Sequence, residues 1–447
     1  MTIKTNNIKK GAISVLFLAV FIDLLEFGII IPLLPFWSLD LGATPFLYGI
    51  LASAYSFMSF IAAPFWGRLS DNYGRRPVIL AGLVGTVLGL GTLLLTATVF
   101  IDSLFMLFLS RLIGGFFTAA TLPASQAYIA DTTEGKDRAK GFGLLGAAFG
   151  LGFALGPGIG GLLSYFGGYA LPALFSTVLA VINLIAAIKF LPESLTNDMK
   201  KQTMILLEPI ENKPSIRSSL SKPTIFLAIL LFAVISLAFS KMQSTLALLG
   251  NIRFGLDETT AGAIFFIIGL IVVITQAGLI RPLTNRYSDT TLIVTGLLFL
   301  TLGFIGLSTV SSLETMILWV IPLALGSSIS NPTLSAFLSK EAPQDNSGAI
   351  LGLNQGVGSF MRISGPLIGT ALFEINAAFP YYLGAIILFS GLVLALMIRY
   401  FIKQSIIGYP CLRCGITLQE GAAICGRCGL EQLNYLVKTS ENKLTSH

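Results

Sequence analysis

Long apolar runs, separated by short charged or Gly/Pro-containing stretches, recur along the whole chain. Each run reaches the roughly 20 mostly apolar residues that a membrane-spanning helix needs. The first run also carries two acids and has no convincing cleavage site, so we expect it to be retained as a helix. Together the runs predict twelve spanning helices. They lie near 11–37, 45–66, 77–99, 103–131, 141–165, 168–191, 223–249, 259–281, 289–310, 313–339, 347–374 and 378–402.

One long polar stretch, 192–222, interrupts this pattern after the sixth run. We interpret it as a linker between an N-terminal half, 1–191, and a C-terminal half, 223–403. The two halves resemble each other at an offset of 209 residues, which pairs several glycines and prolines. The pairs are Pro123 with Pro332, Gly143 with Gly352, Gly156-Pro157 with Gly365-Pro366, and Gly160 with Gly369. Internal repeats of this kind are typical of secondary transporters.

Composition excludes several other classes of protein. Of 447 residues, 54% are hydrophobic and only 11% are charged, whereas a soluble domain is nearer a quarter charged. The one histidine, His447, is the last residue in the sequence, which argues against a Ser-His-Asp triad or a histidine-based metalloprotease. No phosphate-binding G-x-x-x-x-G-K-[ST] string occurs. Transport by this chain would therefore draw its energy from a gradient or a partner, and we predict no enzyme activity.

Lysine and arginine placement predicts the orientation. With the N-terminus in the cytoplasm, 24 of the 28 basic residues fall in inner segments and one, Arg253, in an outer loop. Positively charged loops stay cytoplasmic. We therefore expect a multi-pass protein of the cell (plasma or inner) membrane, embedded in lipid, with both termini in the cytoplasm.

The segment after the second predicted helix combines glycines, one acid and several arginines. Its glycines suggest tight turns, and its proline suggests the start of the next helix. It reads Gly67-Arg68-Leu69-Ser70-Asp71-Asn72-Tyr73-Gly74-Arg75-Arg76-Pro77. This string resembles the signature loop of the major facilitator superfamily. The resemblance implies a gating role for Gly67, Asp71, Gly74, Arg75 and Arg76, with Asp131 joining the charge cluster around Arg75.

The fifth predicted helix carries a regular series of small residues. Glycines four apart let helices approach closely, and a Gly-Pro pair permits a kink. The series contains Gly152, Gly156, Pro157 and Gly160. It resembles the antiporter motif of the same superfamily, and residues 11–402 as a whole resemble its tetracycline-resistance type of drug/proton antiporter. The resemblance implies an all-α fold of twelve helices in two pseudo-symmetric halves, and a conformational role for these four residues.

Five ionisable residues fall inside predicted spans: Asp23, Glu26, Arg111, Lys241 and Arg362. Such charges are expensive in a bilayer and are usually functional or paired. Asp23 and Glu26 are three residues apart on one helical face, and two adjacent acids compete to ionise. We predict that this pair couples proton entry to substrate exit, and the resemblance places Arg111 close to proton handling. Alternatively, either acid neutralises one of the three cations or binds a cationic substrate.

Polar and aromatic side chains in the spans are candidates for the substrate pocket, which transporters of this kind build near the membrane midplane. Each is also a candidate for a simple hydrogen bond between helices. The set is Tyr55, Gln126, Gln243, Asn331, Asn354, Gln355 and Arg362.

All four cysteines lie in the last 40 residues, in two C-x-x-C pairs that are each followed by glycine. This spacing predicts a structural zinc ribbon at 409–430, ahead of a polar tail at 431–447. A redox dithiol pair or an iron–sulfur site is the alternative. The predicted zinc ligands are Cys411, Cys414, Cys425 and Cys428. The ribbon could dock a cytoplasmic protein, and no basic-aromatic pattern suggests nucleic acid.

These features predict proton-coupled efflux of small amphipathic or drug-like molecules by alternating access, carried out by a monomer. One alternative is a proton-coupled transporter of a metabolite such as a sugar, an amino acid or an organic anion. Another is a membrane receptor or scaffold that signals through the ribbon. In vesicles, a transporter would show flux and the receptor or scaffold would not.

Overall fold

The computed structural model describes residues 2–100, 103–133, 135–194, 219–343 and 347–406, and every regular element in these ranges is a helix. The predicted ribbon and tail, and most of the predicted linker, lie outside the described residues. The helices are α1 (Thr2–Ile30), α2 (Leu33–Asp40), α3 (Pro45–Tyr73), α4 (Arg75–Thr98), α5 (Leu104–Thr118), α6 (Thr121–Thr132), α7 (Gly135–Gly167), α8 (Ala170–Phe190), α11 (Pro223–Phe254), α12 (Glu258–Ile274), a π-helical turn (Thr275–Leu279), α13 (Ile280–Arg286), α14 (Asp289–Ser308), α15 (Leu313–Glu341), α16 (Ser347–Ile375) and α17 (Phe379–Ile406).

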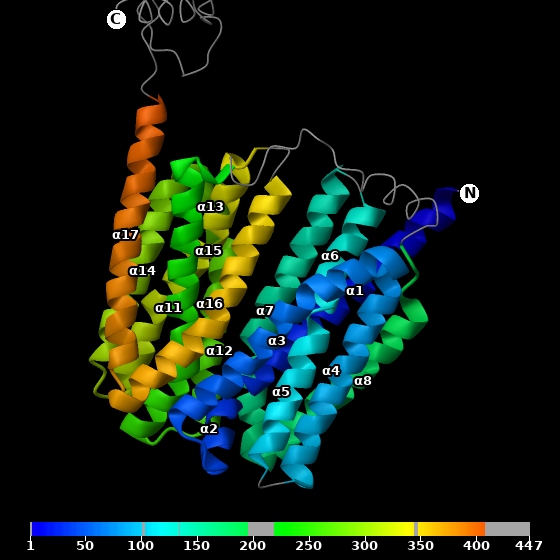
Figure 1. Cartoon of the computed structure of the whole chain (residues 1–447), viewed down its shortest axis with the longest axis horizontal. Helices are drawn as coiled ribbons and strands as arrows, with labels where there is room; N and C mark the ends of the chain where they lie inside the picture. Colours follow the sequence, from blue (N-terminus) through cyan, green and yellow to red (C-terminus); the bar gives the residue numbers. More distant parts are fainter. Residues whose placement is uncertain (1, 101–102, 134, 195–218, 344–346, 407–447) are drawn as a thin grey trace, which may run out of the picture.

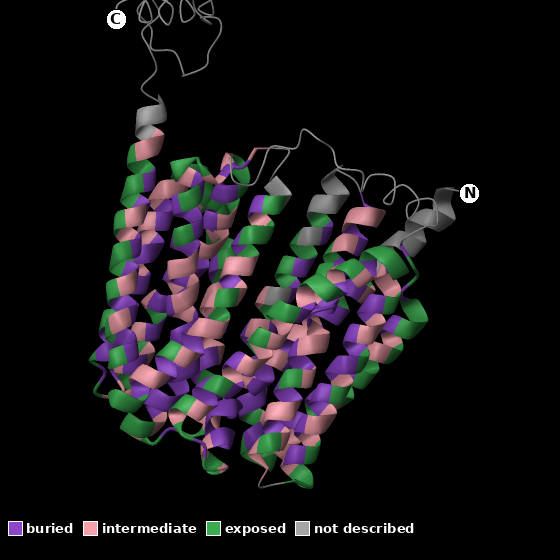
Figure 2. Ribbon diagram, viewed as in Figure 1, coloured by how far each residue is buried: buried purple, intermediate pink, exposed green. Residues whose placement is uncertain are grey.

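Within the described ranges, ten helical stretches are long and apolar enough to cross a membrane. The pair α1 and α2, which is bent by 45°, makes an eleventh. α16 occupies the position of the eleventh predicted helix but is not among these stretches, so the count of twelve spans stays a prediction. Many exposed side chains are large and apolar, for example Ile182, Leu302 and Ile386, as a lipid-facing surface requires. Exposed positions recur along the helices in Figure 2.

Two predicted helices are interrupted, and proline explains both breaks. The run 11–37 divides after Ile30, and the run 103–131 divides after Thr118. Proline has no N–H to donate to the carbonyl four residues earlier and clashes with it. Pro35 thus removes the bond to Ile31, and Pro123 removes the bond to Ala119. Each break falls at the residue that loses its donor.

The helices form two groups, α1–α8 and α11–α17, which lie side by side (Figure 1). We call the end of the bundle where α1 begins and α17 ends the terminal end, and the other the opposite end. The groups meet along two helix pairs, α7 with α12 and α3 with α16. Because each pair joins one helix from each group, these seams connect the two groups.

The seam between α3 and α16 lies toward the opposite end. A Cβ atom on Gly49 would come within 3.0 Å of the Pro366 carbonyl oxygen, so only glycine permits this approach. The Ser53 hydroxyl donates to the Ile363 carbonyl oxygen at 2.8 Å. At the end of the seam the Phe46 backbone N–H, in the first turn of α3, donates to the Glu374 carboxylate at 2.9 Å. A carboxylate at a helix N-terminus is favoured by the exposed N–H groups and the helix dipole.

Toward the terminal end, the same helices are less closely covered. Among the described residues, no atom lies within 4 Å of where a Cβ would stand on Gly143 and Gly146 of α7 or on Gly352 and Gly356 of α16. The groups also separate there in Figure 1. The contacts between α3 and α16 described above therefore lie toward the opposite end, and the ribbons of the two groups diverge toward the terminal end.

The glycines of α7 provide a matched test of packing. A Cβ on Gly160 would clash with the Ile29 carbonyl oxygen of α1, whereas one on Gly143 would meet no atom of the described residues within 4 Å. We expect Gly160→Leu to lower the free energy of unfolding by about 1–3 kcal/mol through overpacking, and Gly143→Leu to leave it nearly unchanged. Thermal unfolding of the purified protein in detergent measures both. Equal losses in the two variants would contradict the close approach of α1 and α7.

Candidate functional site

A cavity lies inside the first group of helices, between α1, α3, α4 and α5. Its walls combine two acids, one arginine and one tyrosine with small and apolar residues. The lining residues are Asp23, Glu26, Phe27, Ile30, Tyr55, Thr86, Gly89, Leu90, Ser110, Arg111, Gly114 and Thr118. The three residues predicted to handle protons, Asp23, Glu26 and Arg111, are thus brought to one cavity.

The two acids lie one turn apart on α1. Glu26 is only 2% exposed, and neither of its carboxylate oxygens has a hydrogen-bond partner among the described residues. One oxygen of Asp23 is buried in the same way. A buried carboxylate without donors is costly in its charged form, and binding of a proton removes that cost. The acid pair is therefore a candidate for proton binding.

Tyr55 and Arg111 face each other across the cavity. The Arg111 guanidinium lies 5.8 Å from the centre of the Tyr55 ring, a cation–π distance. The Tyr55 hydroxyl is hydrogen-bonded to the Thr118 hydroxyl at 2.7 Å. Arg111 is 7% exposed and its Nε has no partner in the described part of the chain. No ion pair joins Arg111 to either acid within those residues, so the alternative in which this arginine neutralises them does not apply in this conformation.

Lys241 lies outside the cavity, inside the second group. Its side chain is 0% exposed and passes Gly369 of α16, where an added Cβ would meet the Lys241 Cγ at 2.6 Å. Its Nζ has no hydrogen-bond partner in the ranges that the structure describes. Lys241 is therefore not paired with Asp23 or Glu26 in this conformation.

The segment predicted as a loop at 67–76 is almost entirely helical. α3 runs through Tyr73 and α4 begins at Arg75, so the expected start at Pro77 was wrong. Only Gly74 lies between them, with φ +125°, in a region that favours glycine. Gly67 is an ordinary helical position, where an added Cβ would meet no atom of the described chain within 4 Å. One glycine is enough to reverse the chain here.

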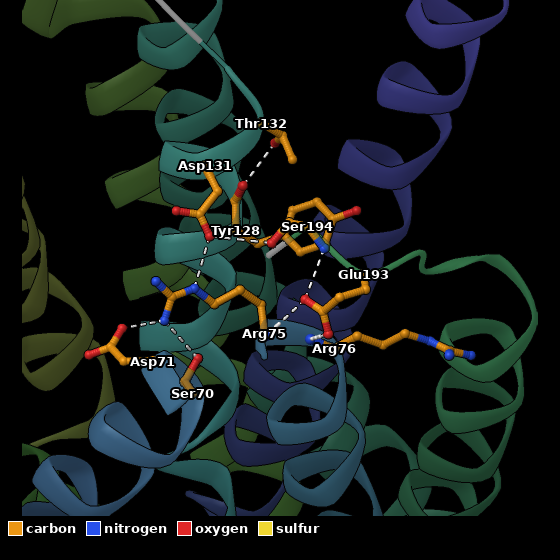
Figure 3. Close-up of polar contacts among 9 residues, drawn as sticks. All are labelled: Ser70, Asp71, Arg75, Arg76, Tyr128, Asp131, Thr132, Glu193 and Ser194. Atoms are coloured by element: carbon orange, nitrogen blue, oxygen red, sulfur yellow. Dashed lines mark hydrogen bonds and ion pairs between the residues drawn. The ribbon is translucent and has the colours of Figure 1, made fainter. Parts of the chain in front are cut away.

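Arg75 holds this turn together (Figure 3). Its Nε donates to Asp131 at the end of α6, at 2.9 Å. Its Nη1 donates to the Asp71 carboxylate and, at 3.2 Å, to the Ser70 hydroxyl. Asp131 thus lies in the charge cluster around Arg75, as the resemblance implied, and Asp71 belongs to the same cluster. Charge-assisted bonds of this kind are strong, and they join α3, α4 and α6.

Sequence reasoning missed Glu193. Its carboxylate accepts the backbone N–H groups of Arg75 at 3.0 Å and Arg76 at 3.2 Å, at the start of α4 (Figure 3). The next residue, Ser194, donates its hydroxyl to Asp131 at 3.3 Å. Arg76 points elsewhere and donates to the Ile188 carbonyl oxygen of α8 at 2.9 Å. An acid directly after the sixth apolar run was the available signal.

The glycines of α7 pack against two neighbouring helices, α1 and α12. Gly152, Gly156 and Gly160 face α1, where an added Cβ on Gly156 would lie 2.7 Å from Gly28. Gly158 and Gly161 face α12 of the other group. α7 is continuous through Pro157. Small residues on two faces let this helix contact both groups, as a pivot between them needs.

Of the seven predicted substrate residues, only Tyr55 lines the cavity. Gln126, Gln355 and Arg362 are exposed, and Asn331 is half-buried. Asn354 and Gln243 each have a buried side-chain atom without a partner in the described ranges. Contact of these residues with a substrate stays a prediction.

Comparison with known proteins identifies relatives over most of the chain. The sequence profile of the Major Facilitator Superfamily matches residues 16–366. The chain is 30% identical to the tetracycline resistance protein, class C, of Escherichia coli over 378 residues, which are 84% of this chain and 92% of that protein. It is 28% identical to multidrug resistance protein 2 of Bacillus subtilis, with 88% and 96% covered. It is 26% identical to the quinolone resistance protein NorA of Staphylococcus aureus, with 86% and 96% covered.

Solved structures show the same fold. The human organic anion transporter MFSD10 (TETRAN) superposes with a TM-score of 0.64 at 23% identity, covering 87% of this chain and 99% of that one. A POT family transporter in complex with 5-aminolevulinic acid gives a TM-score of 0.65 at 16% identity, covering 88% and 96%. At this identity the likeness concerns the arrangement of helices.

Proposed function

The chain belongs to the major facilitator superfamily, and from this premise we propose that it exports small amphipathic, drug-like molecules in exchange for protons. The family is one of membrane transporters, so the prediction of a transporter rather than an enzyme is confirmed. Relatives named for tetracycline, multidrug and quinolone resistance support efflux over metabolite uptake. They also give no support to a receptor or scaffold.

The observation that carries the proton coupling is the acid pair in the cavity. Glu26 is buried with both oxygens unpartnered in the described part of the chain, beside Asp23. We propose that the pair is protonated from the outside and releases its protons to the cytoplasm. Cargo binding favours the ionised pair and proton binding displaces the cargo, so the two move in opposite directions. Arg111 and Tyr55 form part of the cavity wall beside the acid pair.

We propose that the terminal end faces the cytoplasm, as the basic residues of the sequence predict, and that this conformation loads cargo from that side. Arg75, with Asp71 and Asp131, keeps the ends of α3, α4 and α6 together as one unit. The seams at α7–α12 and α3–α16 then open while the terminal end closes. The division into two six-helix halves and the monomeric state belong to the same proposal.

Vesicles with inverted orientation test this function. We expect a fluorescent amphipathic drug to accumulate inside everted membrane vesicles when their interior is acidified, and to leak out when an uncoupler is added. Vesicles without the protein serve as control. Accumulation that ignores the uncoupler, or movement in the other direction, would contradict proton-driven export.

We propose that Cys411, Cys414, Cys425 and Cys428, outside the described residues, bind one structural zinc ion. Among the described residues no group of histidine, cysteine or acidic side chains could hold a metal. We therefore expect about one zinc per chain in the purified protein. Cys411→Ser with Cys414→Ser should abolish it without changing the thermal unfolding of the helices. Elemental analysis measures the metal, and retention of zinc in the double variant would contradict the assignment.

A further inference from the structure

Charges in the middle of the helices are divided between the two groups. Asp23 and Glu26 lie on α1 of the first group, together with Arg111. In the described part of the second group, every acid lies at or beside a helix end, whereas Lys241 and Arg362 lie well inside their helices. The acids are Asp257, Glu258, Asp289, Glu314, Glu341 and Glu374. Within its described residues, the second group therefore carries only positive charge in the middle of its helices.

Arg362 differs from Lys241 in being accessible. It is exposed on α16 and donates to the Ser359 hydroxyl, one turn earlier, at 2.9 Å. The next residue, Ile363, accepts a hydrogen bond from the Ser53 hydroxyl of α3 at 2.8 Å, so Arg362 lies on the part of α16 that packs against α3 close to Tyr55. Tyr55 in turn lines the cavity with Asp23, Glu26 and Arg111. The helix that carries Tyr55 thus borders both the acid cavity of the first group and the stretch of α16 that carries Arg362.

We propose that the cargo is a zwitterion, with an amine held by Asp23 and Glu26 and a carboxylate held by Arg362. This rests on the proposed export function and names the class of molecule it serves. A guanidinium binds a carboxylate through two parallel hydrogen bonds. The rings of Phe27 and Tyr55, whose centres lie 5.2 Å apart, offer an aromatic surface between the two poles.

The charge arrangement disfavours cargo that carries a single charged group, whether positive or negative. A simple cation would satisfy the acids but leave Arg362 facing a second positive charge. A simple anion would satisfy Arg362 but meet two carboxylates when the acids are ionised. Uncompensated charge in a poorly hydrated site is costly. A molecule with separated poles avoids both costs.

Three forms of one scaffold test the proposal. Ciprofloxacin carries an amine and a carboxylate at opposite ends of a flat ring, its methyl ester retains only the amine, and its N-acetyl derivative retains only the carboxylate. We expect the purified protein to bind the zwitterion about tenfold more tightly than either derivative. Arg362→Gln should remove that advantage by weakening binding of the zwitterion and, because it removes the repulsion of a second positive charge, by strengthening binding of the ester, and Arg362→Lys should restore part of the advantage. Arg281→Gln, a change at an exposed arginine of α13, is the matched control.

The outcomes separate this inference from the function on which it rests. Equal binding of the zwitterion and the ester by the unaltered protein would overturn the proposal that the cargo is a zwitterion. An equal loss for both forms in Arg362→Gln, at unchanged thermal stability, assigns Arg362 to helix structure and overturns its role. Proton-driven uptake into everted vesicles is measured for all three forms in parallel. Equal proton-driven uptake of all three forms would contradict only the preference for a zwitterion. Binding that prefers the zwitterion, without proton-driven uptake of any form, would contradict only the proposed export.

Discussion

Replacing Asp23 with asparagine and Glu26 with glutamine together is expected to reduce the accumulation ratio of cargo to about one at any pH difference. Both amides keep the size of the acids but bind no proton. The double variant therefore lacks the groups that would couple the proton gradient to transport. One pH unit can drive at most about tenfold accumulation per proton exchanged, and all of it should disappear. Downhill movement should persist, because the cavity walls and the seams are unchanged.

Proteoliposomes with an imposed pH difference measure this result, and each single variant shows whether one acid is enough. Glu314→Gln is the matched control, since this acid is exposed in the first turn of α15. Continued accumulation by the double variant would remove the acid pair from the mechanism.

Arg75→Ala should have the largest effect outside the cavity. It removes the ion pairs to Asp71 and Asp131 and leaves the latter, only 14% exposed, without its cation. Breaking a largely buried pair in this way costs about 3 kcal/mol. We expect a lower melting temperature and about a tenfold loss of transport rate, since α3, α4 and α6 no longer move as one unit.

Arg68→Ala is the control for Arg75→Ala, because it removes the same charge from an exposed position one and a half turns before the end of α3. It should change neither stability nor rate by more than a small factor. A similar loss in both variants would mean that general positive charge, rather than the bonds of Arg75, matters at this surface.

Hydropathy predicted where the helices lie, because a membrane-spanning helix needs a continuous run of apolar residues and a charged side chain in the bilayer costs free energy. It did not predict the breaks at Ile31 and Ala119, although Pro35 and Pro123 were visible in the sequence. The helical course through 67–73 was missed because glycine and charge at a membrane surface resemble a loop. Only Gly74, with its positive φ, actually turns the chain.

The candidate site was partly predictable for the same reason. Acids and an arginine inside apolar runs stand out, and the structure gathers Asp23, Glu26 and Arg111 around one cavity. Polar residues such as Gln126 and Asn354 carry no such signal, because an amide serves equally well between helices. Glu193 was signalled only by its place directly after the sixth apolar run, and its partners are backbone N–H groups, which a residue pattern does not identify.

The seam between α3 and α16 has a consequence for the resting cell. Gly49 lets α3 approach the backbone of α16 closely, and the Glu374 carboxylate accepts the Phe46 N–H at the start of α3. This leaves little room for a file of water molecules along the seam, so we expect little ion leakage between α3 and α16 in this conformation. A membrane that contains many copies of the protein should then maintain its membrane potential. The proton gradient would be dissipated only when cargo is bound and transported.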